Sequence, residues 1–100
     1  MRNYLTAAKA RKMTEKAAER ARNKCYHRII SSIEDSIRVR IDDGEYRYHT
    51  TFRKREWMDD HMADCLQKHF RACGFSVEAK FVKTDEYNWD YYDFTISWDA

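Results

Sequence analysis

The chain has 100 residues, of which 43% are hydrophobic and 36% are charged, and its formal net charge at pH 7 is +2. This length allows one small globular domain, and no apolar run approaches the roughly 18 residues that a membrane-spanning helix needs. The sequence has no proline and only two glycines, which excludes a glycine-rich loop for nucleotide phosphates. No secretory signal opens the chain. We therefore expect a protein without a cofactor that is neither secreted nor membrane-spanning.

The charge is distributed unevenly along the chain. Residues 1–28 carry nine Lys or Arg and two Glu side chains, which gives this segment a net charge of +7. Because the whole chain sums to +2, the other 72 residues sum to −5. The two parts should therefore attract different partners.

The first predicted element is a helix over residues 7–42, with Thr6 as its N-cap. Its first half is rich in Ala, Lys, Arg and Glu, which favour helix but leave little to bury. From Tyr26 onward, apolar residues recur at steps of three and four, as on one face of a helix: Tyr26, Ile30, Ile33, Ile37 and Ile41. At 1.5 Å per residue this helix would be about 50 Å long, so we expect it to project from the domain.

An alternative structure competes over residues 37–52. Ile37, Val39 and Ile41 alternate with polar residues, and Asp43-Gly44 is a strong turn signal, which together favour a β-hairpin. The helical period is unbroken up to Ile41, however, and Gly44 serves equally well as a helix stop. We favour the helix.

A second helix is predicted over residues 56–73, between strands at 45–51, 75–82 and 92–98. Gly74 is the expected left-handed stop of this helix, and Phe75 should fold back on Phe70. Alternating apolar and polar residues mark the last two strands. The apolar stripe of the central helix comprises Met58, Met62, Cys65, Leu66, His69, Phe70 and Cys73.

These elements predict an α+β fold in two parts. Residues 1–44 form a long, charged, projecting helix that mediates association. Residues 45–100 form a compact β-α-β-β domain, a three-stranded sheet covered on one face by the central helix. A domain already covered in this way has little need for the apolar stripe of the long helix, so we expect a partner to bury that stripe.

His61, Cys65, His69 and Cys73 follow one another at steps of four along the central helix. One adjacent His–Cys pair could bind zinc only with further ligands from elsewhere, and no established zinc motif is present. Cysteine in a helix more often packs as a small hydrophobic residue. No oxyanion-hole candidate or paired carboxylates accompany these thiols. We therefore expect neither a metal site nor catalytic residues, and no enzyme activity.

Two groups of residues are the predicted contacts with partners. An aromatic-rich loop offers Tyr87, Trp89 and Tyr91, residue types that are enriched in binding hot spots. Together with the stripe residues Tyr26, Ile30, Ile33 and Ile37, these are the candidate protein contacts. The candidate contacts with phosphate or with an acidic partner are the basic residues Lys9, Arg11, Lys12, Lys16, Arg20 and Arg22.

The whole chain also resembles a large group of small tailed-bacteriophage proteins, most of which have no assigned role. The similarity lies in Leu5-Thr6-Ala7-Ala8-Lys9-Ala10-Arg11, in Gly74-Phe75 after a helix, and in the final Ile96-Ser97-Trp98. The resemblance implies a phage origin and no particular activity.

The expected function is that of a non-enzymatic interaction module. It would be a virion or assembly component, in the virion or the host cytoplasm, that docks on copies of itself or on other phage proteins through its long helix. The alternative is a regulator that binds a host protein or nucleic acid through the basic helix.

Overall fold

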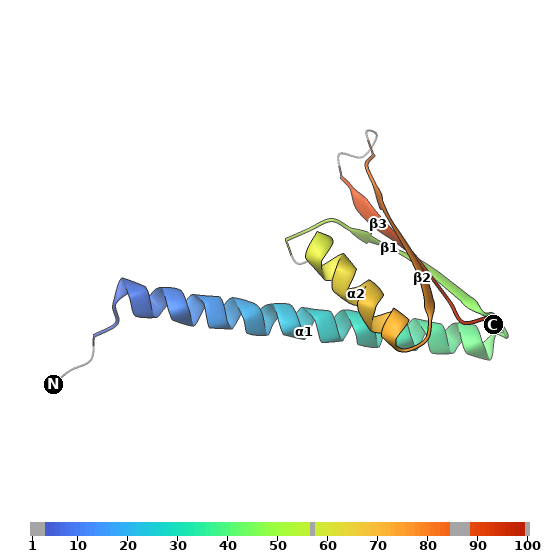
Figure 1. Cartoon of the computed structure of the whole chain (residues 1–100), viewed down its shortest axis with the longest axis horizontal. Helices are drawn as coiled ribbons and strands as arrows, with labels where there is room; N and C mark the ends of the chain where they lie inside the picture. The colour runs from blue at the N-terminus through green and yellow to red at the C-terminus, as the bar shows by residue number, and fades with distance from the viewer. Residues whose placement is uncertain (1–3, 57, 85–88, 100) are drawn as a thin grey trace.

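The computed structural model describes residues 4–56, 58–84 and 89–99. The α+β class predicted from the sequence is confirmed, with a long helix followed by a β-α-β-β arrangement (Figure 1). In chain order the elements are α1 (Ala7–Asp42), β1 (Arg47–Arg53), α2 (Asp60–Ala72), β2 (Ser76–Val82) and β3 (Tyr91–Ser97).

Helix α1 is continuous from Ala7 to Asp42, so the alternative hairpin over residues 37–52 is wrong. Thr6 is the N-cap, as predicted, and its hydroxyl accepts a hydrogen bond from the amide of Lys9, with an N–O distance of 3.2 Å. The helix extends past Ile37 because this side chain is buried in the core, with 4% of its surface exposed. Tertiary packing therefore outweighs the local β-propensity of this segment.

Both helices end at a glycine in the left-handed conformation. Gly44 has a φ of +77° and Gly74 a φ of +94°. After Gly74 the amide of Phe75 donates to the carbonyl of Phe70 at 3.0 Å, and the two rings pack edge to face with centroids 5.9 Å apart. The predicted helix stop and the apolar contact that accompanies it are both confirmed.

Helix α2 begins at Asp60, four residues later than predicted. Asp59 is its N-cap, because its Oδ1 accepts a hydrogen bond from the amide of Met62 at 2.8 Å. Met58, which the sequence placed on the helical stripe, is fully buried but lies before the helix, where its backbone pairs with that of Arg55. The spacing of apolar residues predicted a longer helix because Met58 fits the helical period, although it reaches the core from the turn before α2.

The sheet has the order β1-β3-β2, and both neighbouring pairs are antiparallel. Strands β1 and β2 are therefore parallel to each other and are joined through α2, with β3 inserted between them, which is a split β-α-β unit. Phe94 of the central strand lies opposite Thr50 of β1 and Ala79 of β2.

The core lies between one face of this sheet and both helices. From β3 it contains Tyr92, Phe94 and Ile96, and from α2 it contains Leu66 and Phe70, all at most 4% exposed. Helix α1 adds four buried residues, Ile29, Ile30, Ile33 and Ile37. Helix α2 covers this face of the sheet, as predicted, but the predicted division at residues 44 and 45 needs correction, because the second half of α1 belongs to the same core.

The first half of α1 extends well beyond this body (Figure 1). The molecule measures 66 × 34 × 19 Å, and its radius of gyration is 18.0 Å, whereas a compact domain of this size would have about 13 Å. Residues 7–24 of α1, which we call the arm, include no buried residue.

Candidate interaction site

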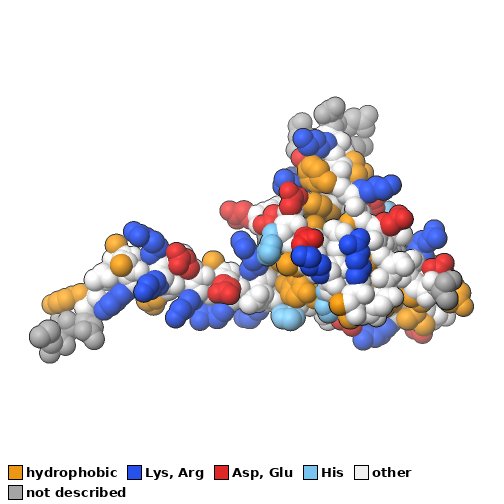
Figure 2. Space-filling view, viewed as in Figure 1, with side chains coloured by type: hydrophobic (Ala, Val, Ile, Leu, Met, Phe, Trp, Pro, Cys, Tyr) orange, Lys and Arg blue, Asp and Glu red, His pale blue; other side chains and the backbone are white. Residues whose placement is uncertain are grey.

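The arm presents five basic side chains along one side of the helix. They recur at steps of three and four residues, the spacing that places side chains on one face. Figure 2 shows Lys and Arg side chains along the arm. None of the five makes an ion pair with another residue that the structure describes. This basic stripe consists of Lys9, Lys12, Lys16, Arg20 and Lys24.

The structure separates the six basic residues predicted as contacts into two groups. Lys9, Lys12, Lys16 and Arg20 belong to the basic stripe. Arg11 and Arg22 lie on a different side of the helix, at steps of four and three from Glu15 and Glu19. Lys24 was not among the predicted contacts, although it continues the stripe.

A cleft of about 440 Å³ lies where the arm meets the body, between α1 and α2. Tyr26 and Met62 contribute apolar surface to its wall, and its other residues are mostly basic or polar. We call this the junction cleft. Its lining residues are Arg22, Asn23 and Tyr26 of α1 and His61, Met62, Cys65, Lys68 and His69 of α2.

Two contacts shape the wall of the junction cleft. The rings of Tyr26 and His69 meet edge to face, with centroids 6.2 Å apart and an interplanar angle of 89°. The Sγ of Cys65 lies 3.6 Å from Nε2 of His61. Partial burial raises the pKa of Tyr26 above its ordinary value, and the nearby Cys65 and Cys73 add to this effect. The tyrosine therefore remains a neutral, amphipathic surface in the ordinary pH range.

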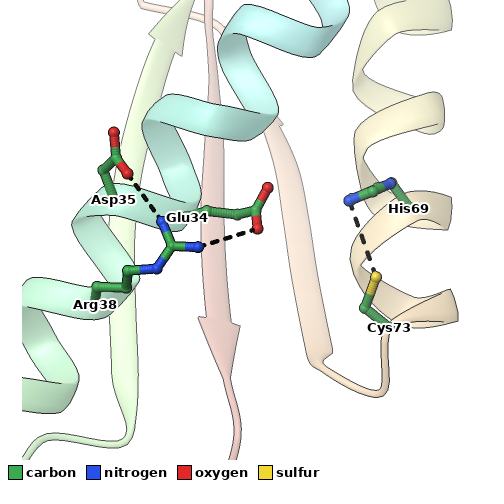
Figure 3. Close-up of polar contacts among 5 residues, drawn as sticks. All are labelled: Glu34, Asp35, Arg38, His69 and Cys73. Carbon is green, nitrogen blue, oxygen red and sulfur yellow. Dashed lines mark hydrogen bonds and ion pairs between the residues drawn. The ribbon is translucent and has the colours of Figure 1, made fainter.

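A second groove, of about 240 Å³, lies nearer the C-terminal ends of the two helices, and Ile37, Phe70 and Phe75 are among its lining residues. Figure 3 shows three polar contacts beside it. Arg38 is paired with Glu34 at 3.8 Å and with Asp35 at 3.0 Å, and His69 lies 3.9 Å from Cys73. The charges beside this groove are therefore already paired, unlike those of the arm.

The predicted role of the isoleucine stripe needs correction. Ile30, Ile33 and Ile37 are 6%, 2% and 4% exposed, because they pack against the rest of the same chain. They are not available to a partner. Of the predicted stripe contacts, only Tyr26 reaches the surface, where it lines the junction cleft.

The predicted aromatic loop is only partly described by the structure. Tyr87 lies outside the described residues. Trp89 is 40% exposed, and the guanidinium carbon of Arg53 lies 4.7 Å from the centroid of its ring. Tyr91 is the half-buried first residue of β3. The structure thus leaves Trp89 as the exposed aromatic residue of this group among those it describes.

The histidines and cysteines of α2 form two separate pairs along the helix. Cys65 contacts His61, and Cys73 contacts His69, one helical turn apart in each case. Within the described ranges, no three His, Cys, Asp or Glu side chains lie close enough together to hold one metal ion.

The same ranges contain no helix that is long and apolar enough to cross a bilayer.

Sequence reasoning missed the junction cleft. His61, Lys68 and Asn23 were not assigned to any surface site, because their proximity depends on how α1 crosses α2. One signal was available in the spacing. Tyr26 is the first apolar residue of the α1 stripe, so the change from charged to apolar residues marks the point where the helix enters the body.

Comparison with known proteins gives this chain no relative. Neither a scan against models of protein families nor searches of curated proteins and of solved structures produced a match.

Proposed function

We propose that this protein is a non-enzymatic interaction module whose arm binds an acidic surface on a protein partner. One observation carries the proposal, namely that the basic stripe projects from the body with its five cations unpaired among the described residues. A helix that only served the core would begin near Tyr26, where the side chains become partly buried. The arm instead adds five turns on the N-terminal side, and these turns carry charged side chains rather than apolar contacts.

On the basis of the sequence resemblance to small bacteriophage proteins, we propose particle assembly as the setting of this interaction, with the arm docking on other subunits. That setting rests on the three sequence segments alone. A fixed copy number of this protein in purified particles would support the setting, whereas its absence from particles would remove it.

Nucleic acid is the second candidate partner, and the same basic stripe favours it. Lys and Arg at helical spacing can follow a phosphate backbone without reading its sequence. The span from Lys9 to Lys24 is about 22 Å of helix, enough for several phosphates of a duplex. The regulator predicted as the alternative function would bind in this way.

Fluorescence anisotropy with two polyanions separates these candidates. The probes are a labelled poly-glutamate peptide and a labelled 20-base-pair DNA duplex, each titrated with the full chain at several salt concentrations. Tighter binding to poly-glutamate supports the acidic protein partner. Tighter binding to DNA, with an affinity that falls steeply and linearly on a log–log plot against salt, supports nucleic acid.

Matched triple variants show whether the arm is responsible. Lys9→Gln with Arg20→Gln and Lys24→Gln removes three cations from the basic stripe. Arg47→Gln with Lys80→Gln and Lys83→Gln removes three exposed cations from the body. We expect the first variant to lower the affinity about tenfold and the second to leave it nearly unchanged. Equal losses in the two variants, or no binding of either probe by the wild type, would contradict the proposal.

A further inference from the structure

The junction cleft has a lining that suits a negatively charged ligand. Its volume of about 440 Å³ falls within the range of about 300 to 1,000 Å³ that ligand sites occupy. Two permanent cations, Arg22 and Lys68, line the cleft together with two histidines. No Asp or Glu is among the lining residues that the structure describes. The cleft is therefore complementary in charge to an acidic group.

Arg22 is the cation of this cleft that is free to bind a ligand. Lys68 is paired with Asp64, one turn earlier on α2, at an N–O distance of 2.9 Å. Arg22 makes no ion pair with any residue in the described part of the chain, although Glu19 lies three residues before it. A guanidinium presents its N–H donors in a planar fork that matches a carboxylate. Arg22 is therefore the group best suited to hold a carboxylate at the cleft.

Other residues of the cleft offer apolar and aromatic surface. Tyr26 is half-buried, and its ring meets that of His69 edge to face. Met62 and Cys65 line the cleft from α2. An aromatic side chain suits this surface, because both aromatic rings and sulfur atoms make favourable contacts with another ring. The ligand that fits the whole lining therefore has an aromatic group next to a carboxylate.

The cleft adjoins the end of the basic stripe. The stripe reaches Lys24, and Arg22 and Asn23 line the cleft on the same turn of α1. An acidic segment that follows the stripe along the arm therefore arrives at the cleft. A small free acid would make no use of the stripe, so this continuity favours a segment of a protein as the occupant.

We propose that the junction cleft binds an aromatic side chain of the acidic protein partner, with a neighbouring carboxylate of the same segment held by Arg22. This inference rests on the proposed function, because it places the anchor of the partner at the end of the surface that the arm offers. The basic stripe supplies attraction along the arm. The cleft supplies a preference for segments that have an aromatic residue among acidic ones.

Two peptides of equal charge test the preference for an aromatic residue. They are labelled poly-glutamate peptides of the same length, one with Phe and the other with Ser at the central position. Each is titrated with the full chain by fluorescence anisotropy. We expect the Phe peptide to bind about tenfold more tightly than the Ser peptide, because its ring is buried in the cleft. Equal affinities would overturn the proposal.

Arg22→Gln and Arg11→Gln are matched variants that test the role of Arg22. Both arginines are exposed, and each lies within four residues of a glutamate, Arg11 before Glu15 and Arg22 after Glu19. Arg11 lies outside the cleft. We expect Arg22→Gln to lower the affinity for the Phe peptide about tenfold and Arg11→Gln to change it less than about twofold. Equal losses in the two variants would contradict the placement of a carboxylate at Arg22.

Alkylation of the native cysteines locates the bound peptide. Cys65 lines the junction cleft, whereas Cys73 lines the second groove. A saturating concentration of the Phe peptide should slow the reaction of Cys65 with iodoacetamide several-fold and leave that of Cys73 unchanged, as measured by mass spectrometry. Tight binding without selective protection of Cys65 would place the peptide outside the cleft and overturn the proposal.

The outcomes separate this inference from the proposed function. Binding of both peptides that is weakened by the triple variant of the basic stripe, with no gain from Phe, overturns the cleft site alone. Binding of the Phe peptide that Arg22→Gln weakens and the stripe variant does not overturns the role of the arm and keeps the cleft site. Hydrocinnamate that protects Cys65 as well as the Phe peptide does would make the occupant a small aromatic acid and overturn the protein segment. No binding of either peptide overturns both proposals.

Discussion

The hydroxyl of Tyr92 in β3 donates a hydrogen bond to Oδ1 of Asp60 in the first turn of α2, with an O–O distance of 2.5 Å. The ring of Tyr92 is buried, with 4% of its surface exposed, while Asp60 is at the surface. This bond joins the central strand to the start of the helix that covers it. The burial of the tyrosine and the neighbouring carboxylates, that of Asp60 first, raise the pKa of Tyr92 well above its ordinary value.

Tyr92→Phe should lower the free energy of unfolding by about 1.5 kcal/mol, the lower end for a hydrogen bond to a charged group. The loss is modest because Asp60 is exposed and can be hydrated when its donor is removed. Urea unfolding measures the change. Tyr46→Phe is the control, since Tyr46 is 63% exposed and should tolerate the same chemical change. Equal effects of the two substitutions would show that the Tyr92–Asp60 bond adds no stability.

The stability should decline at alkaline pH, and Tyr92 should contribute to the decline. Above about pH 10 the unfolded chain loses the phenolic proton of residue 92 while the folded chain retains it. The folded state then binds more protons, so stability falls by up to about 1.4 kcal/mol per pH unit from this residue. Tyr92→Phe lacks this contribution, and the stabilities of variant and wild type should converge as the pH rises from 9 to 11. A gap that stays constant would contradict this account.

Ile33→Ala should lower the free energy of unfolding by about 2 to 5 kcal/mol, as for a large-to-small change in a core. Ile33 is 2% exposed, which places the second half of α1 among the core elements. Ile41→Ala provides a matched control on the same helix, because Ile41 is 53% exposed. Denaturant unfolding measures the difference in stability between the two variants. An equally small effect of both substitutions would show that this half of α1 is not part of the core.

Two truncations should locate the boundary of the folding unit. Removing residues 1–24 deletes the arm, and none of the described residues in this segment is buried, so cooperative unfolding should persist. Removing residues 1–44 also deletes four buried isoleucines, and the remaining chain should lose its cooperative transition. Circular dichroism during thermal unfolding distinguishes the two. A cooperative transition in the shorter fragment would restore the division first expected from the sequence.

Much of the fold follows from the spacing of apolar residues. The alternation of Tyr92, Phe94 and Ile96 gives β3 and its buried face, and Gly74 gives the end of α2. These features are local, so the sequence determines them without reference to the rest of the chain. The start of α2 does not follow in this way, because Met58 satisfies the helical period while lying in a turn.

The destination of an apolar stripe cannot be read from its spacing. Ile30, Ile33 and Ile37 were expected to meet another subunit, but they meet the sheet and α2 of their own chain. A helix face needs the same apolar stripe whether it packs within its own chain or against another subunit. Only the tertiary structure shows which of the two it does. For the same reason the junction cleft could not be predicted, since Tyr26 and Cys65 are brought together by the crossing of two helices.

Helix α1 is one continuous helix, but its two halves should protect their backbone amides from hydrogen exchange to very different degrees. The backbone amides of the arm are held only by their own helical hydrogen bonds, and the arm should open from its N-terminal end without disturbing the body. Beyond Ile29 the same helix should open only when the whole core does. Amide hydrogen exchange should therefore change by orders of magnitude within a few residues of Tyr26. A partner that covers the arm would erase this step, which makes the exchange profile of α1 a direct readout of where binding occurs.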